Sequence, residues 1–463
     1  MSSMDGTERS RFARKAIRVA EAQRLLLARV RPLAAETVPL AASYGRRLAA
    51  DVAADRPVPH FARSGMDGYA VRHEDAAAAS PQQPAALRVV GDVPAGRVWP
   101  HPLAPGTAVR IMTGAAVPEG ATAVVMLEQT EELERGARVL IKQPPAAGQH
   151  IAPVGDEIAA GQRLIASGAR IGPGQAALLA TFGCAAVCVY SRPRVGIFAT
   201  GSELLPVEAE LAPGRIRNSN GPMLAAQVER AGGVPVWLGI LPDDAAEAQA
   251  RIAAALAHTD LVVTTGGVSV GDYDAMASLF RQGLAQGRAG RGAGLLGGQP
   301  QEGSGIGMGS MLSEPADKSD AEPLCATLFN KLALRPGSPT SAAIAGRKLI
   351  VGLSGNPGAC FVGFELLVRP LLLRMQGAAE PLPRTFRAAL TDDFVKGSPH
   401  DRYLRAKLEL DDGIVRVRPL GFAKSGMMVS IQDADALAVI PAGSRGAAQG
   451  ELVEVIPLAY GEP

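Results

Sequence analysis

The chain has 463 residues, of which 47% are hydrophobic, 47 are Lys or Arg and 45 are Asp or Glu. One hydrophobic core rarely supports such a length, and about 150 residues per domain predicts roughly three domains. The near balance of charge excludes a broad basic surface, so we expect no nucleic acid and no membrane among the partners.

Membrane, secreted and zinc-binding classes are also disfavoured. No apolar run approaches the ~18 residues of a membrane span, and the start of the chain lacks a signal-peptide core, which predicts a cytoplasmic protein. Four cysteines do not suggest a disulfide framework, and the histidines show no zinc-ligand spacing. Cys184 and Cys188 stand in CAAVCVY, a strand-like run in which we expect buried thiols.

The first third of the chain changes from helical to β texture. Residues 10–31 place Ile17, Leu25, Leu26 and Val30 at helical spacing, which predicts an amphipathic helix that packs on a neighbouring module. Residues 54–146 contain short apolar runs, ALRVV, TAVRIM, TAVVML and ARVLIK, separated by Gly and Pro turns. This texture predicts a small all-β module.

Three later segments share one design, an apolar strand that ends in a glycine-containing loop: VGIFATGSEL, LVVTTGGVSVGD and LIVGLSGNPGA. Helical texture follows two of them, at 221–232 and 358–375. The alternation predicts parallel βαβ units in a twisted open sheet, a doubly wound α/β domain. Ligands of such sheets bind at the carboxyl ends of the strands.

Two further regions differ from this pattern. Residues 285–322 are rich in Gly, Ser and Ala without periodicity, and we expect a flexible surface insertion or, as the alternative, a docking segment. Residues 381–463 return to short strands, YLRAKLEL, GIVRVRPL, ALAVIPA and LVEVIPL, which predicts a C-terminal β module.

The stretch DLVVTTGGVSVGDYD, residues 260–274, suits a phosphate ester. Gly266 and Gly267 can adopt positive φ and expose N–H groups as an anion nest. Ser269 adds a hydroxyl, and Asp272 and Asp274 add carboxylates of the kind that Mg²⁺ takes beside phosphate. Ordinary helix capping by an aspartate is the alternative interpretation.

The other strand ends strengthen the binding hypothesis. Their loops add polar groups: Thr200, Ser202 and Glu203 from ATGSEL, and Ser354 and Asn356 from GLSGNPGA. In NKLALRPGSPT, Lys331 and Arg335 stand four residues apart and suit a phosphate or a tetrahedral oxyanion, unless they belong to a solvated charged face. We expect these loops to form one pocket.

Taken in order, many motifs resemble the molybdopterin molybdenumtransferase family, the MoeA proteins and the homologous C-terminal region of gephyrin. They are SGMDGYAV, GDVPAG, RIMTGAAVPEGATAVVMLEQT, GIFATGSELL, NSNGPML, GILPDD, TTGGVSVGDYD, KLALRPGSP and GLSGNP. Their order and spacing follow the family outside the insertion, and the resemblance covers nearly the whole chain.

The resemblance implies an α/β multidomain protein that forms a homodimer. The implied domains are a split mixed linker domain at 1–53 plus 147–190, a β-rich domain at 54–146, a molybdopterin-binding doubly wound α/β domain at 191–376, and a C-terminal β domain at 377–463. The coarse textures described above agree with this plan.

The resemblance also implies the last step of molybdenum cofactor biosynthesis. Members of the family take adenylylated molybdopterin and molybdate, cleave the pyrophosphate link with Mg²⁺, release AMP and leave molybdenum on the dithiolene. A molybdopterin adenylyltransferase is the implied upstream partner, because it supplies the adenylylated substrate.

The family's functional positions fall on particular residues of this chain. The implied catalytic residues are Asp67, Thr113, Glu203, Asp243, Asp274 and Lys331. The implied cofactor-binding residues are Thr200, Gly201, Ser202, Gly266, Gly267, Ser269, Arg335, Ser338, Ser354, Gly355 and Asn356. The implied metal ligands are Glu157, Glu203, Asp243 and Asp274. Because the family builds its pocket across the dimer, Asp67 and Thr113 would serve the partner chain.

Four positions depart from the family pattern. Arg335 and Ser338 replace lysines, Ser354 replaces a proline, and the order Gly-Asp-Glu-Ile puts the metal carboxylate on Glu157, one methylene further out. Loss of a cation at Ser338 removes a charge-assisted hydrogen bond of about 1.5 to 3 kcal/mol, which predicts weaker binding of the oxyanion.

Two other functions remain open at this point. A divergent, non-catalytic relative would bind molybdopterin or partner proteins as a scaffold, but would have no use for the retained carboxylates. Adenylyl transfer to molybdopterin is disfavoured, because related adenylyltransferases carry Gly-Gly-Thr-Gly where this chain has Gly266, Gly267, Val268 and Ser269. We therefore expect the metal-inserting enzyme.

Overall fold

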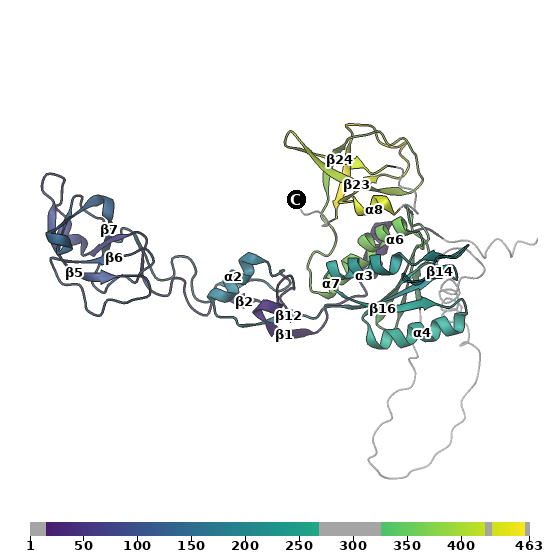
Figure 1. The fold of residues 1–463 in the computed structure, drawn as a ribbon, viewed down its shortest axis with the longest axis horizontal. Coiled ribbons are helices and arrows are strands. Elements are labelled where there is room, and N and C mark those ends of the chain that lie inside the picture. Colours follow the sequence, from purple (N-terminus) through teal and green to yellow (C-terminus); the bar gives the residue numbers. More distant parts are fainter. Residues whose placement is uncertain (1–14, 268–325, 422–427, 459–463) are drawn as a thin grey trace, which may run out of the picture. The chain divides into compact units, whose positions relative to one another are not determined.

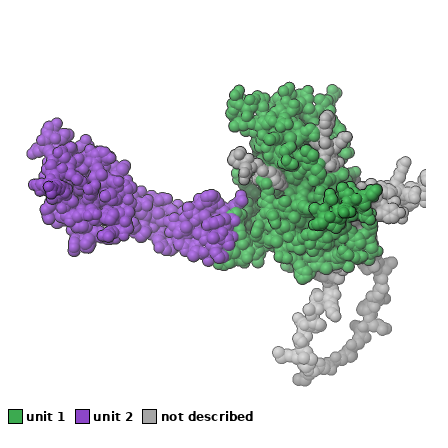
Figure 2. All heavy atoms as spheres, in the orientation of Figure 1, with its two compact units in different colours: residues 1–38, 45–49, 188–463 green, residues 39–44, 50–187 purple. Residues whose placement is uncertain are grey.

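A computed structural model describes residues 15–267, 326–421 and 428–458. The chain divides into two compact units, one of Met1–Val38, Gly45–Ala49 and Cys188–Pro463, the other of Pro39–Tyr44 and Ala50–Val187 (Figure 2). The predicted insertion at 285–322 lies outside the described residues. In the described part of the chain, no helix is long and apolar enough to cross a membrane.

The unit that contains residues 50–187 is built on a mixed six-stranded sheet in the order β7-β4-β6-β5-β9-β8. Its strands are β4 (Gly68–Val71), β5 (Ala85–Val93), β6 (Thr107–Ile111), β7 (Ala123–Met126), β8 (Thr130–Leu133) and β9 (Arg138–Ile141). Tyr69 and Val71 pack into one apolar cluster and Ala70 into another, so the alternation of the strand buries both faces of the sheet. The predicted all-β module is confirmed.

Shorter elements complete this unit. They are the 3₁₀ turns Leu40–Ala42, His73–Ala76, Leu127–Gln129 and Glu134–Gly136, the paired strands β2 (Val52–Ala53) and β11 (Arg163–Ile165), the paired strands β3 (Arg63–Ser64) and β10 (Ile151–Ala152), and helix α2 (Pro173–Thr181). Pro173 occupies the first turn of α2, where its missing N–H leaves no intrahelical bond unmade.

The other unit contains a six-stranded sheet in the order β16-β13-β17-β21-β20-β18. Its strands are β13 (Arg194–Thr200), β16 (Val234–Leu241), β17 (Leu261–Thr265), β18 (Ala326–Phe329), β20 (Ser341–Ala345) and β21 (Lys348–Leu353). The first four strands in that order run parallel, and β20 runs antiparallel to both of its neighbours, β21 and β18. All five residues of β17 are buried, as expected for a central strand covered on both faces.

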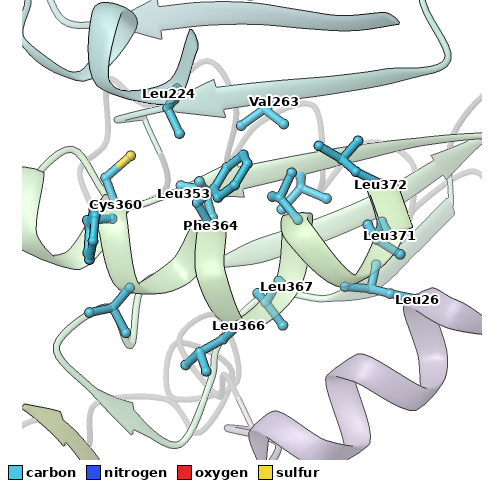
Figure 3. Close-up of a cluster of buried hydrophobic side chains, with 14 of the residues drawn as sticks. Leu26, Leu224, Val263, Leu353, Cys360, Phe364, Leu366, Leu367, Leu371 and Leu372 are labelled. Atoms are coloured by element: carbon cyan, nitrogen blue, oxygen red, sulfur yellow. The ribbon is translucent and has the colours of Figure 1, made fainter. Parts of the chain in front are cut away.

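Helices cover both faces of this sheet (Figure 1). On one face lies α4 (Ala245–His258), which buries Ala248, Ile252 and Ala255 at helical spacing. On the other lie α1 (Val19–Leu27), α3 (Asn220–Arg230), α6 (Pro357–Gly363) and α7 (Arg369–Met375). Leu26, Leu224, Phe364 and Leu371 meet in this second layer (Figure 3). The predicted doubly wound α/β domain is confirmed.

A π-helical segment, Phe364–Val368, connects α6 to α7. Pro370 has no N–H to donate to the carbonyl of Leu366, four residues earlier. The side chain of Gln23 in α1 donates to that carbonyl at 2.8 Å. The N-terminal helix therefore satisfies a backbone group that the proline leaves open.

The C-terminal part forms a closed sheet. Its strands are β22 (Phe386–Leu390), β23 (Asp401–Asp411), β24 (Ile414–Pro419), β25 (Ala436–Ile440) and β26 (Leu452–Pro457), with helix α8 (Val429–Gln432) beside them. The pairing of β23 with β25 closes the ring, and its apolar residues fill the interior. The two-residue strand β19 (Leu334–Arg335) pairs with β23. The predicted multidomain fold class is confirmed.

Local differences from the sequence predictions have simple causes. The N-terminal helix spans Val19–Leu27 rather than 10–31, of which 10–14 lie outside the described residues. Strand β12 (Ala186–Tyr190), which pairs with β1 (Ala35–Pro39), was expected to bury both nearby thiols. Instead Cys188 is exposed and Cys184 half-buried, because alternation turns Cys188 away from the buried Val187 and Val189.

Candidate functional site

The strand ends of the α/β sheet bring three predicted loops to one edge. In β13, β17 and β21 the register places Ala199 beside Thr265 and Thr265 beside Leu353. The loops that begin at Gly201, Gly266 and Ser354 therefore start side by side. The prediction that these loops share the carboxyl edge of a parallel sheet is confirmed.

Gly266 lies at the closest approach of these loops. Its φ is +86°, and a Cβ there would lie 2.5 Å from the carbonyl oxygen of Thr200. A Cβ on Gly355 would in turn lie 3.3 Å from the Cα of Gly266. The Gly266 N–H donates to Leu353 at 3.1 Å, so this N–H extends the sheet. An anion nest at this turn would use the N–H of Gly267.

A buried amide ties two of these loops together, the loop that begins at Gly266 and the loop that begins at Ser354. Asn220, the first residue of α3, donates from Nδ2 to Thr265 Oγ1 at 2.7 Å and to the Gly355 carbonyl at 2.7 Å. Thr265 Oγ1 also lies 3.3 Å from the carbonyl of Ser354. The sequence reasoning did not single out Asn220 or Thr265. The signal for Asn220 was its place in NSNGPML, directly before a helix.

Two of the predicted carboxylates stand at the same edge. Both oxygens of Glu203 lie over Gly201, 2.5 and 2.7 Å from the position that a Cβ would take. Asp243 follows β16 by two residues, and Leu241 of that strand pairs with Thr200. Both side chains are exposed. Their hard oxygens match the ligands that Mg²⁺ prefers.

The other implied metal ligands do not lie beside Glu203 and Asp243 in the part of the chain that the structure describes. No group of three His, Cys, Asp or Glu side chains lies together in the part of the chain that the structure describes. Asp274 and Ser269, with Asp272, fall outside the described residues. Glu157 lies in the other unit, where its carboxylate is 3.9 Å from the guanidinium of Arg63.

The segment 330–340 also leaves the sheet at this edge, because β20 runs antiparallel to β21. Leu332 and Leu334 are buried in the core and hold the segment, which leaves Lys331 half-buried and Arg335 exposed. In the pairing of β19 with β23, the backbone of Arg335 stands opposite that of Arg402. Burial and the nearby Arg335 charge lower the pKa of Arg402. The cationic character predicted for this edge therefore includes a residue of the C-terminal barrel.

The hydroxyl of Ser338 has a structural partner. It donates to the carbonyl of Leu332 at 2.7 Å, and the Leu332 N–H returns a bond of 3.0 Å to the Ser338 carbonyl. The only proton of this hydroxyl therefore closes the loop. In this conformation Ser338 has no proton to donate to an oxyanion.

Asp67 and Thr113 form a second polar cluster, in the unit that contains residues 50–187. Asp67 Oδ1 accepts the Thr113 N–H at 2.6 Å and the Thr113 hydroxyl at 2.9 Å. These two bonds, with a smaller contribution from the Arg110 charge, lower the pKa of Asp67 below its ordinary value of 3.8. Both side chains are exposed, so the pair presents a fixed carboxylate to solvent.

Comparison with family models divides the chain into three matches. The MoeA N-terminal region (domain I and II) matches residues 17–183, a probable molybdopterin binding domain matches 196–374, and the MoeA C-terminal region (domain IV) matches 387–458. The loops of the sheet edge thus lie in the second match, and the Asp67–Thr113 pair in the first.

Similar proteins agree with these matches. The molybdopterin molybdenumtransferase of Bacillus subtilis (strain 168) is 40% identical over 91% of this chain and 89% of that protein. The protein of the same name from Staphylococcus aureus (strain MRSA252) is 38% identical over 96% of both chains. A crystal structure of the molybdopterin biosynthesis MoeA protein from Pyrococcus horikoshii OT3 superposes with a TM-score of 0.75 at 29% identity, over 96% of this chain and 100% of that chain.

These likenesses extend over nearly the whole chain, and they include the unit with the sheet edge and the unit with Asp67. They confirm the resemblance inferred from the motifs. The chain belongs to the MoeA family of molybdopterin molybdenumtransferases, enzymes of molybdenum cofactor biosynthesis.

Proposed function

We propose that this protein inserts molybdenum into adenylylated molybdopterin, with Mg²⁺-dependent cleavage of the pyrophosphate link and release of AMP. Molybdate and adenylylated molybdopterin are the substrates. The reaction is the last step of molybdenum cofactor biosynthesis, and a molybdopterin adenylyltransferase acts before it as the upstream partner.

One observation carries the proposal. Three glycine-containing loops, with Glu203 and Asp243, converge on one edge of a sheet in a chain of this family. A phosphate ester needs backbone N–H groups within reach, which the N–H of Gly267 would supply, and oxygen ligands for a cation, which the two carboxylates would supply. The converging loops and the two carboxylates at one edge support the proposal.

We assign the residues of this edge to three roles: binding of the phosphate, attraction of the oxyanion and coordination of the metal. Thr200, Ser202, Ser354 and Asn356 bind and orient the pterin phosphate together with the glycine loops, and Lys331 and Arg335 attract the oxyanion. Glu203 and Asp243 would hold Mg²⁺, with Asp274 and Glu157 as the further ligands that we propose. When bound, the metal supplies charge neutralisation at the cleaved phosphate.

We further propose that the protein acts as a homodimer in which Asp67 and Thr113 serve the partner chain. Mixed dimers of an inactive Asp67→Asn chain and an inactive Asp243→Asn chain then contain one site with neither change. Such dimers should regain part of the wild-type activity. Mixed dimers that form and stay inactive would contradict the shared site and leave the chemistry of the sheet edge untouched.

AMP release tests the proposal. The purified chain is incubated with adenylylated molybdopterin, with and without molybdate and with and without Mg²⁺, and AMP is quantified by chromatography. We expect release that depends on both additions. The engaged hydroxyl of Ser338 favours one competitor, a divergent scaffold that binds molybdopterin without turnover, and that protein would bind the substrate and release no AMP.

A further inference from the structure

A pocket of ≈ 480 Å³ lies beside the edge strand β16, within the unit that carries the sheet edge. Its walls come from the segment after β14 (Leu204–Leu205), from the turn after β15 (Ile216–Arg217), from the first turns of α3 and from β16 itself. This volume falls in the range of about 300 to 1,000 Å³ typical of small-molecule sites. The loops described above do not use it.

Trp237 gives the pocket an aromatic wall. It is 49% exposed, although the residues beside it in β16 are half-buried. One end of its ring rests on Gly221, where a Cβ would lie 2.9 and 3.0 Å from two ring carbons. Gly221 therefore fixes the ring from one side and leaves part of its surface open. An open indole is a platform on which a flat ring can stack.

Asn218 gives the pocket a polar group. Its residue is only 4% exposed, and its Oδ1 accepts the Gly221 N–H at 3.1 Å. No hydrogen bond among the described residues uses its Nδ2, which lies 2.9 Å from the Cβ position of Gly221, next to the Trp237 ring. This donor is not among the buried polar atoms that lack a partner, so it is accessible, and a ligand in the pocket can accept its hydrogen bond. Glu208, an exposed residue that lines the pocket, offers acceptor oxygens to the same ligand.

The pocket is adjacent to the edge that we assign to the phosphate. Beyond its wall at Ile240, β16 ends at Leu241, and Asp243 follows. Leu241 pairs with Thr200, the residue before the loop of Gly201 and Glu203. One ligand can therefore hold its phosphate at the loops and place a ring against Trp237.

We infer that this pocket binds a planar nitrogen heterocycle of the substrate, which stacks on Trp237 and accepts a hydrogen bond from Asn218 Nδ2. The inference rests on the proposed function, whose substrate carries two such rings, a pterin and an adenine. Both offer a flat face and ring nitrogens that accept hydrogen bonds. The test below determines which of the two enters.

The chain provides its own probe. It contains two tryptophans, Trp99 and Trp237, so Trp99→Phe leaves fluorescence that reports on the pocket alone. This variant is titrated separately with AMP, with pterin and with inorganic phosphate, and free N-acetyltryptophanamide corrects for absorbance. We expect saturable quenching by AMP if adenine enters, or by pterin if the pterin enters, and none by phosphate. Absence of quenching by either ring, or equal quenching by phosphate, would overturn the inference.

A matched pair of variants tests the hydrogen bond. In the Trp99→Phe background, Asn218→Asp keeps an acceptor for the Gly221 N–H and removes the amide donor. It should weaken ring binding by about tenfold. Asn218→Asp also adds a negative charge, which repels the phosphate of AMP. Pterin carries no phosphate, so its affinity, if it binds, reports the loss of the hydrogen bond without this repulsion. Leu211→Ala removes an exposed apolar side chain of the same segment that does not line the pocket, and it should leave the affinity unchanged.

Trp237→Leu completes the test by equilibrium dialysis with the ring that quenched. We expect binding at least about tenfold weaker with an unchanged Tm, and wild-type affinity would overturn the stacking role. The outcomes remain separable from the proposed function. AMP release without ring binding rejects this inference alone, and ring binding without AMP release rejects the proposed reaction alone.

Discussion

Asp243 and Asp244 are adjacent aspartates after β16, and we expect them to have different roles. The Asp244 carboxylate accepts the Glu247 N–H at 2.8 Å and caps α4, whereas Asp243 is exposed at the sheet edge. Asp243→Asn should lower turnover by about a hundredfold at unchanged Tm, since it removes a carboxylate that we propose as a ligand of Mg²⁺. Asp244→Ala should keep turnover and cost about 1 kcal/mol of stability. AMP release measures turnover, and thermal unfolding measures stability, for each variant. Normal turnover in Asp243→Asn together with lost turnover in Asp244→Ala would refute the assignment.

The Asp67–Thr113 pair has a pH signature. Hydrogen bonds from Thr113 lower the pKa of Asp67 below 3.8 in the folded protein. The stability that they contribute is therefore present above pH 3.8 and is lost as the pH falls through the folded pKa. Thr113→Val removes the hydroxyl bond and keeps the backbone bond, so the pKa should rise part of the way toward 3.8.

An NMR titration of labelled aspartate carboxyls measures this shift. Thr130→Val is the control, because the Thr130 hydroxyl donates to the carbonyl of Leu127 and not to Asp67. A pKa of Asp67 that is the same in wild type and Thr113→Val would show that the hydroxyl bond contributes nothing in solution.

For single residues, sequence-based prediction was more successful for exposed side chains than for the buried or engaged side chains that organise the site. Glu203 could be named from its loop and Asp243 from the family resemblance, and both are exposed at the sheet edge. Asn220 was missed because its role depends on Thr265 and Gly355, which lie 45 and 135 residues away. The engaged proton of Ser338 was missed for the same kind of reason, since only the folded loop brings Leu332 to it.

Among the elements, the turn after β17 is the most constrained. Gly266 combines φ +86° with a neighbouring carbonyl 2.5 Å from the Cβ position, so Gly266→Ala should destabilise the protein by about 2 kcal/mol or more. Gly214→Ala, at φ +74° with nothing within 4 Å, should cost only about 1 kcal/mol for the left-handed backbone. Denaturant unfolding compares the two variants. Equal losses of stability in the two variants would mean that the loop of Gly266 can move away from the Thr200 carbonyl to admit the Cβ.

The segment 330–340 gives a prediction about charge. Ser338→Lys should lower the molybdate concentration needed for half-maximal AMP release, more clearly at low salt, because it adds a cation near Lys331 and Arg335. Ser338→Ala loses only the bond to Leu332, so it should cost about 1 kcal/mol of stability and leave the molybdate requirement unchanged. A requirement that Ser338→Lys leaves unchanged or raises would show that this segment does not meet the oxyanion.

Element prediction succeeded where local pattern and burial agree. The strands of the β modules and β17 were predicted because alternating or continuous apolar runs fix their type. Helix α4 was not predicted, although Asp244 at its N-cap and its alanine-rich turns carry a helix signal. The expected burial of Cys188 failed because composition does not tell which face of a strand meets the core.

For the molecule as a whole, the sequence predicted the order of modules and the edge where the loops meet. It did not predict that β23 pairs with β25 to close the C-terminal barrel, because such pairing depends on contacts distant in sequence. The sequence also did not predict that the first helix belongs to the α/β core, where Val19, Ala22 and Leu26 are buried. Helical periodicity marks an apolar face and does not name the partner that covers it.

The central claim is that cleavage of the adenylylated substrate and insertion of molybdenum occur together at this sheet edge. The most direct test measures, in one reaction with molybdate and Mg²⁺, the AMP released and the molybdenum retained on the pterin. We predict that the two rise together in about equal amounts and that both are lost in Asp243→Asn. Substrate binding without AMP, or AMP release without molybdenum on the pterin, would contradict the account.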